Sequence, residues 1–257
     1  MKAENFTLRH YFDRIGFEGP AAVDIATITG MMRRQLFTVP FENLDVQARK
    51  GVSLVPEQIV EKILHRKRGG YCYEVNGIFA MALQALGVPY QFVAARPMFY
   101  PVRRPKTHMA LVLTVNDAQW LCDLGFGSYG IRAPIRLDVL DAEVKQDFDT
   151  FMLTRSSEQA YLLKALVDGR WENQYAFDLS AQEWIDFAPA NYLNSTHPDA
   201  IFVQKLLVIQ HNEAGRKLMF GNTLKIITNG QTEQTLIGSE DVQRLLSFEF
   251  GLTVPEC

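Results

Sequence analysis

Cys72 is the residue of this sequence best suited to covalent chemistry. It follows Arg68-Gly69-Gly70-Tyr71 and begins a segment with helical periodicity, so its sulfur should lie beside free backbone N–H groups at the positive end of a helix dipole. Both effects favour the thiolate, and the two glycines allow an abrupt turn with space near the sulfur. The pattern predicts a nucleophile, although a small buried hydrophobic side chain fits the local context equally well.

His108 is the best placed of the five histidines to act as the base for such a nucleophile. It begins the alternating segment 108–113, after the polar stretch 103–107, and should therefore lie at the rigid end of a strand. A lone histidine at a strand start is more often structural, so that alternative stays open. The other histidines are expected on helical surfaces (His10 and His65) or in polar, turn-like surroundings (His197 and His211).

Asp123 lies within the apolar run 120–124, where a carboxylate is expected to be buried. Burying it without a partner would cost several kcal/mol. His108 can supply that partner, because the short connection Asn116-Asp117-Ala118 lets the two strands form a hairpin. The hairpin predicts a base paired with an orienting carboxylate, and it points Cys122 to the opposite face, into the core.

The segment Gly125-Phe126-Gly127 follows Asp123 directly and has two interpretations. A G-x-G segment can cradle a phosphate, which makes Gly125 and Gly127 the candidate cofactor-binding residues, but no helix follows to supply an anion-binding end. A tight turn beside Cys72, His108 and Asp123 accounts for the segment better. Phe126 would then present its ring to the pocket.

The elements that must position these residues change character at Gly87. From Val75 to Leu86 apolar residues follow helical spacing, and Gly87 suits a left-handed C-terminal cap. Beyond it, strand-like alternation dominates. The other expected helices are 27–38, 56–67, a short one opened by a capping box of Ser180 and Glu183, and 239–248. The expected strands are 90–95, 108–115, 119–124, 151–155, 160–167, 170–177, 206–210, 216–220 and 223–228.

Composition excludes several classes of protein. The 257 residues are 47% hydrophobic and 21% charged with a net charge of -3, which is typical of a globular protein and disfavours nucleic-acid binding. Residues 1–13 lack the apolar stretch of a signal peptide, and no run approaches the ~18 apolar residues of a membrane span. The three cysteines have no C-x-x-C spacing, so we expect a cytoplasmic protein without a structural metal.

Four motifs together resemble the arylamine N-acetyltransferases, and they occur in that family's order over nearly the whole chain. They are Pro40-Phe41-Glu42-Asn43-Leu44-Asp45, Arg68-Gly69-Gly70-Tyr71-Cys72-Tyr73-Glu74 with Asn76-Gly77, Thr107-His108, and Asp123-Leu124-Gly125-Phe126-Gly127. Two positions depart from the family pattern: Gln35 stands where many members carry histidine, and Tyr73 replaces a frequent phenylalanine. The sequence also stops at Cys257, earlier than in many members, so the CoA contacts and the size of the acceptor cleft are not predicted.

The resemblance implies a mixed α+β fold with a triad arranged as in cysteine proteases. We expect a helical bundle with the nucleophile (1–87), a β-barrel with the histidine and aspartate (88–190) and an α/β lid (191–257). The resemblance also implies that Cys72 takes an acetyl group from acetyl-CoA and passes it to an arylamine, arylhydrazine or N-hydroxyarylamine, with His108 relaying the proton and Asp123 orienting it. Phe41 and Phe126 match ring positions of the acceptor pocket. Acetyl-CoA is then a cosubstrate, and no tightly bound cofactor is expected.

Three other functions remain open at the level of sequence. A cysteine hydrolase uses the same triad with water as acceptor, and a macrolactam-forming amide synthase uses it on large polyketide chains. A binding module with an unused triad is disfavoured by the intact Cys72, His108 and Asp123. The preferred acceptor and the oligomeric state are not predicted.

Overall fold

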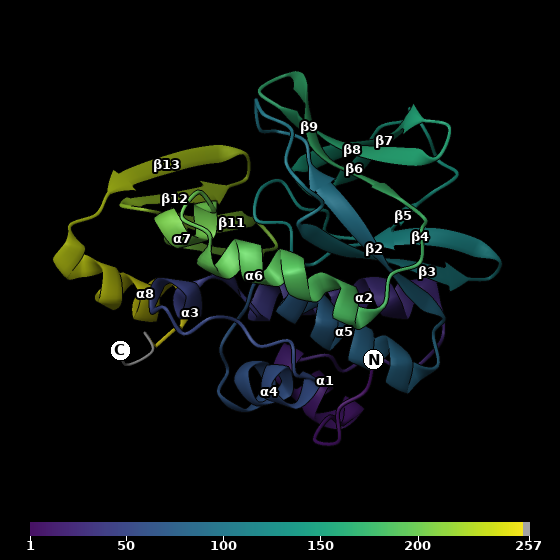
Figure 1. The fold of residues 1–257 in the computed structure, drawn as a ribbon, viewed down its shortest axis with the longest axis horizontal. Helices are drawn as coiled ribbons and strands as arrows, with labels where there is room; N and C mark the ends of the chain where they lie inside the picture. Colours follow the sequence, from purple (N-terminus) through teal and green to yellow (C-terminus); the bar gives the residue numbers. More distant parts are fainter. Residues whose placement is uncertain (254–257) are drawn as a thin grey trace.

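The structure, a computed structural model, describes residues 1–253. Its first part is helical (Figure 1). The turn Glu61–His65 is a π-helical continuation of α4. The expected helix 56–67 is therefore observed as an α-helical segment followed directly by a π-helical one. The elements are α1 (Leu8–Ile15), α2 (Ile25–Thr38), β1 (Phe41–Glu42), α3 (Leu44–Gln47), α4 (Pro56–Val60) and α5 (Cys72–Leu86).

Helix α5 is the centre of this helical part. It begins at Cys72 and ends before Gly87, whose φ of 79° gives the predicted left-handed cap. Its periodicity predicts one apolar stripe, yet every residue from Cys72 to Leu83 is buried. Gly77 and Ala80 allow close packing on the remaining faces, and Asn76 is hydrogen-bonded there. The nucleophile candidate therefore lies at the start of a helix that is enclosed by the rest of the molecule.

The second part is an eight-stranded antiparallel sheet that curls into a nearly closed barrel, in the order β5-β4-β3-β2-β9-β8-β7-β6. In the predicted hairpin, β3 pairs with β4 through a two-residue turn in which Asn116 (φ 50°) and Asp117 (φ 59°) are both left-handed. The strands are β2 (Tyr90–Pro97), β3 (His108–Val115), β4 (Ala118–Cys122), β5 (Ile135–Arg136), β6 (Val144–Gln146), β7 (Asp149–Ser157), β8 (Ala160–Val167) and β9 (Arg170–Asp178).

A second antiparallel sheet, sheet A, has the order β1-β10-β11-β12-β13 and lies beside the barrel (Figure 1). Together with the helices it gives the mixed α+β fold that was predicted. Sequence reasoning missed β13, since all six of its residues are exposed and carry no alternating apolar pattern. The elements are β10 (Leu207–Asn212), β11 (Gly215–Phe220), β12 (Thr223–Thr228), β13 (Gln231–Leu236), the 3₁₀ turn Ser239–Asp241 and α8 (Val242–Phe250).

Strand β1 connects sheet A to the loop before Cys72. On one side Phe41 pairs with Ile209 of β10. On the other side Glu42 donates its N–H to the carbonyl of Gly70 (3.0 Å), and Gly70 donates to the carbonyl of Pro40 (3.3 Å). Residues distant in sequence thus hold the loop before Cys72 in place.

The chain passes from the barrel to sheet A through a 3₁₀ turn (Trp184–Phe187), α6 (Ala188–Thr196) and α7 (Ile201–Gln204) (Figure 1). The predicted capping box of Ser180 and Glu183 is wrong. The helix begins later, and Glu183 donates its N–H to the Asp186 carboxylate (2.7 Å). The expected boundary at residue 190 falls inside α6, so this helix spans both regions. Within residues 1–253, no helix is long and apolar enough to cross a membrane.

Candidate active site

A cavity of about 730 Å³ lies where the start of α5, the barrel and sheet A meet. Cys72 and His108 both line it, as do Gly125, Phe126 and Gly127. Asp123 is not in its wall and lies behind His108, 1% exposed. The three residues predicted to form a triad are therefore brought together, two of them with access to the cavity.

His108 and Asp123 are joined by a hydrogen bond of 2.7 Å between Nε2 and Oδ2. His108 begins β3, and Asp123 follows the last residue of β4, so the hairpin places both at the same end of the strand pair. The other carboxylate oxygen of Asp123 accepts from the Gly125 N–H at 2.9 Å. The pairing satisfies a carboxylate that would otherwise be costly to bury.

Asn76 connects the three predicted residues, and sequence reasoning gave it no role. Its Nδ2 donates to the Met109 carbonyl (2.7 Å) and to Asp123 Oδ1 (3.1 Å), while its Oδ1 accepts from the Leu124 N–H (2.8 Å). It lies one helical turn after Cys72, so a single side chain fixes α5 against β3 and the end of β4. Asn76 is a polar residue in an otherwise largely apolar helical segment, four positions after a cysteine. That pattern could have indicated its role.

The electrostatics of Cys72 are a balance of opposing effects. Burial raises the pKa of the thiol above its ordinary value, and the Asp123 carboxylate acts in the same direction. Hydrogen bonds from the backbone N–H groups of Met109 and Tyr73 lower it. The helix terminus predicted to favour a thiolate is present, but burial opposes it, so ionisation requires a nearby acceptor for the proton. Cys122 is also buried, and Cys257 lies outside the described residues.

Two aromatic rings pack against His108 and against each other. Phe126 meets it with ring centroids 5.0 Å apart, and the fully buried Tyr175 of β9 meets it at the same separation. Phe126 and Tyr175 also contact each other edge to face at 4.8 Å. Burial raises the pKa of the Tyr175 phenol well above its usual value. Nothing in the local sequence around Tyr175 indicated this placement, which follows from the pairing of β9 with β2, the neighbour of β3.

The two glycines proposed as phosphate ligands have close packing neighbours. A Cβ on Gly125 would lie 2.5 Å from the Cys72 Cα, and one on Gly127 would lie 3.0 Å from the Phe41 ring. Both residues line the cavity, whereas Phe41 lies behind Gly127, with its ring 5.9 Å from that of the cavity-lining Phe202. The turn brings the chain against the backbone of Cys72, which is sufficient reason for glycine at position 125.

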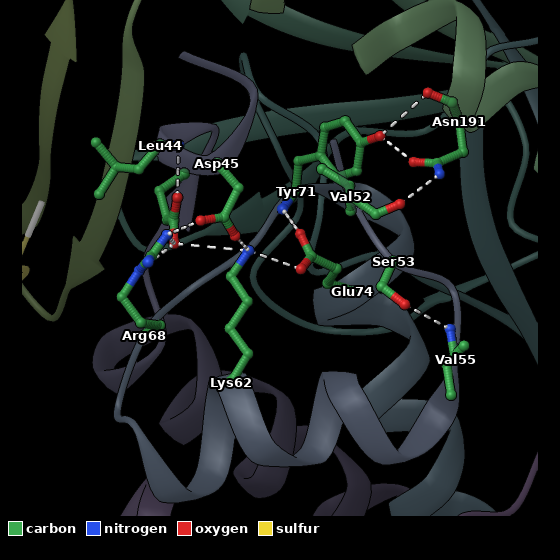
Figure 2. Close-up of polar contacts among 11 residues, drawn as sticks. Leu44, Asp45, Val52, Ser53, Val55, Lys62, Arg68, Tyr71, Glu74 and Asn191 are labelled. Carbon is green, nitrogen blue, oxygen red and sulfur yellow. Dashed lines mark hydrogen bonds and ion pairs between the residues drawn. The ribbon is translucent and has the colours of Figure 1, made fainter. Parts of the chain in front are cut away.

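A buried cluster of charged side chains supports the loop before Cys72 (Figure 2). Lys62 Nζ lies 2.6 Å from Asp45 and 2.7 Å from Glu74, and Arg68 lies 2.7 Å from Glu42. Glu74 also accepts the Tyr71 N–H at 3.1 Å, which caps α5 next to Cys72. The motifs 40–45 and 68–74 thus meet in one cluster of three carboxylates and two cations.

Burial, with a smaller contribution from Glu42, makes Glu74 sensitive to pH. Burial raises its pKa to about 7, although Lys62 opposes the shift. The folded protein therefore takes up a proton near pH 7 that the unfolded chain takes up only near its ordinary value of 4.5. This group contributes stability that is fully present below 4.5 and is lost as the pH rises through 7.

We expect Glu74→Gln to remove that contribution while keeping an acceptor for the Tyr71 N–H. Relative to the variant, the wild-type protein should lose unfolding free energy between about pH 5 and about pH 8, as measured by urea unfolding at several pH values. Glu61→Gln is a matched control, because the Glu61 side chain is 46% exposed and, among the described residues, forms its ion pair only with Arg66. Parallel pH profiles for wild type and Glu74→Gln would contradict the assignment.

His211 is not in the polar turn that its sequence neighbours indicated. It is buried in β10, opposite Arg216 of β11, because the turn begins only after Asn212. Burial, together with Arg132 and Arg216, lowers its pKa well below the usual value, so it is neutral. Its surroundings form a cluster of arginines and aspartates at the cavity wall.

Comparison with known proteins places the chain among acetyl-transferring enzymes. A family profile described as N-acetyltransferase matches residues 24–256. The arylamine N-acetyltransferase of Escherichia coli strain K12 is 33% identical over 217 residues, which are 84% of this chain and 76% of that protein. The solved arylamine N-acetyltransferase of M. tuberculosis superposes with a TM-score of 0.92 at 30% identity, covering 96% of this chain and 94% of that one. The Mycobacterium marinum enzyme, solved in complex with CoA, superposes with 0.89 at 28%, covering 95% and 92%.

Proposed function

Because this chain belongs to the arylamine N-acetyltransferase family, a family of acyltransferases, we propose that it moves an acetyl group from acetyl-CoA to an aromatic amine or hydrazine through a thioester on Cys72. The observation that carries the proposal is the cavity that exposes Cys72 and His108 together, with Asp123 bonded behind the imidazole. The CoA named for the Mycobacterium marinum structure supports the choice of donor.

The first half-reaction begins with proton transfer from Cys72 to His108. Nε2 of His108 is bonded to Asp123, so Nδ1 is the ring nitrogen left to accept the proton. The thiolate attacks the acetyl carbonyl, the CoA thiolate leaves, and the imidazolium returns the proton to it. Asp123 stabilises the cation while it exists. The products are free CoA and an acetyl thioester on Cys72.

The second half-reaction uses the same groups in reverse. The amine attacks the thioester carbonyl, His108 removes a proton from the nitrogen, and the Cys72 thiolate leaves and is protonated again. The nitrogen gains an acetyl group, and the enzyme returns to its starting state. CoA leaves before the amine reacts. Plots of reciprocal initial rate against reciprocal acetyl-CoA concentration, at several fixed amine concentrations, should therefore be parallel lines.

The wall of the cavity favours an aromatic acceptor over water. Apolar side chains from the turn after Asp123, from α7 and from sheet A line the space next to Cys72. Such a surface receives a ring and offers few partners to an ordered water molecule. This supports transfer over the hydrolase alternative. The side chains are Phe126, Phe202, Leu207, Ile209 and Leu218.

The test is mass spectrometry of the protein after incubation with acetyl-CoA alone. We expect one added acetyl group, located on Cys72 after digestion and lost when an arylamine is supplied. No adduct, or an adduct on another residue, would contradict the proposal. A hydrolase would instead release acetate continuously without an amine.

A further inference from the structure

One face of sheet A forms a wall of the cavity. Side chains of alternate residues point to the same face, and the register places Phe220, Leu218 and Arg216 in a row along β11. Their partners on this face, Leu207 and Ile209 in β10 and Lys225 and Ile227 in β12, also line the cavity. The opposite face packs on α8 through Val208, Met219 and Leu224. Arg216 is thus the charged end of an otherwise largely apolar row.

The guanidinium of Arg216 is held in position but only partly used. Its Nη1 bonds Asp149 Oδ2 at 2.9 Å, and its Cζ lies 4.3 Å from the centre of the Tyr129 ring. Its side chain is 7% exposed. Among residues 1–253, Nε and Nη2 have no acceptor, so one edge of the guanidinium carries two free donors.

The charges around Arg216 do not balance. Arg132 bonds the same oxygen of Asp149 at 2.6 Å and lies 3.3 Å from Asp147, which also binds Arg33 at 2.8 Å. Three arginines therefore share two carboxylates, and within the described chain no other acidic side chain reaches them at ion-pair distance. The neighbouring His211 is buried with an unpartnered Nδ1 and adds no charge. The cluster therefore carries one net positive charge, and Arg216 is its member at the cavity wall.

We infer that Arg216 is a subsite for a carboxylate carried by the acceptor, so that the enzyme favours acidic aromatic amines. This inference rests on the proposed function. Two donors on one edge of a guanidinium match the two oxygens of a carboxylate, and burial strengthens the pairing. The apolar side chains of Leu218 and Ile227 flank the site and can contact the ring that carries the carboxylate.

The cavity holds other charged groups, and they provide a control. Lys225 projects from the same face of β12, next to Leu218, but it is half-buried and has no ion pair in the described structure. Arg104 lies in the loop after β2 against the Tyr100 ring, and Asp168 and Asp199 also line the wall. If the cavity charge as a whole attracted anions, Lys225 would matter as much as Arg216.

Arg216→Met is expected to fold, because Asp149 keeps Arg132 as its partner and the remaining arginines and aspartates balance. Arg216→Lys keeps the charge but not the paired donors. The probes are 4-aminobenzoate and 3-aminobenzoate with their methyl esters, which present the same rings without the charge. The readout is kcat/KM for each acid relative to its ester, at saturating acetyl-CoA.

One of the two aminobenzoates will be the better substrate of the wild-type protein. For that aminobenzoate, we expect Arg216→Met to lower kcat/KM by at least about tenfold, and for its methyl ester by less than about twofold. Arg216→Lys should retain part of the wild-type preference for the acid over its ester. Lys225→Met should leave the ratio of kcat/KM for acid and ester unchanged. Equal losses for acid and ester in Arg216→Met, or the same effect in Lys225→Met, would overturn the subsite.

A second arm separates the acceptor from the donor, whose phosphates are also anions. Acetylation of Cys72 is measured with acetyl-CoA and with p-nitrophenyl acetate, which has no phosphate. If Arg216→Met raised KM for acetyl-CoA alone and spared the acids, Arg216 would bind the donor and the inference would be wrong. If the wild-type protein acetylated the esters but showed no dependence on Arg216, only the subsite would fail. If the wild-type protein took no acetyl group from acetyl-CoA, both the proposed function and the subsite would be wrong.

Discussion

Cys72→Ser is expected to fold normally and to lose acetyl transfer by at least about 10³-fold. The hydroxyl is far less acidic than the thiol, and burial at the start of α5 already opposes ionisation of the group at this position. His108 can accept a proton from a thiol much more readily than from an alcohol. The measurements are the initial rate of arylamine acetylation and the mass of the protein after incubation with acetyl-CoA.

Cys122→Ala is the matched control, because Cys122 is equally buried and lies beside Asp123 in the sequence. Its side chain packs in the core, so the variant should lose some stability through the smaller side chain and keep its activity. Substantial turnover in Cys72→Ser, or a loss in Cys122→Ala as large as that in Cys72→Ser, would refute the assignment of the nucleophile.

Asp123→Asn should reduce the rate of Cys72 acetylation by about 10²-fold or more, by analogy with the same change in serine protease triads. Asp123 Oδ1 accepts from Asn76 and from the Gly125 N–H, so an asparagine would keep its oxygen on that side. Its NH₂ group would then face His108 Nε2, which must give up its hydrogen to avoid opposing donors. The imidazole proton moves to Nδ1, and Nδ1 can no longer accept from Cys72.

The loss should appear in the acetylation half-reaction itself, followed by rapid quenching and mass spectrometry. Asp178→Asn serves as a control, since Asp178 also accepts from a cation and a backbone N–H but lies at the end of β9, outside the cavity wall. If Asp123→Asn were folded and acetylated Cys72 at nearly the normal rate, the site would reduce to a pair of Cys72 and His108.

Features set by short stretches of chain were predictable from the sequence. The end of α5 at Gly87 follows from local spacing and capping, and the β3–β4 hairpin follows from a two-residue connection. That hairpin alone brings His108 to Asp123. The link from the hairpin to Cys72 is not local: the chemistry of a nucleophile and its base suggested it, and the resemblance to a family strengthened that prediction.

Features set by distant pairing were not predictable. His211 has the polar neighbours of a turn, but pairing with β11 buries it beside Arg216. Strand β13 is polar except for Leu236 and exposed throughout, and it exists because β12 offers it a partner edge. Phe41 has the sequence context of a pocket residue, yet it lies behind Gly127 because β1 joins sheet A. In each case tertiary contacts override the local pattern.

The position of β1 between the loop before Cys72 and β10 bears on the order in which the cavity is completed during synthesis. Gly70 is bonded to β1, and β1 completes its pairing only with a strand translated long after it. Closing a loop of that length is slow and entropically costly, so it should be among the late events of folding. A growing chain therefore carries Cys72 for most of its synthesis without the wall that sheet A provides, and that wall forms only after β10 has left the ribosome.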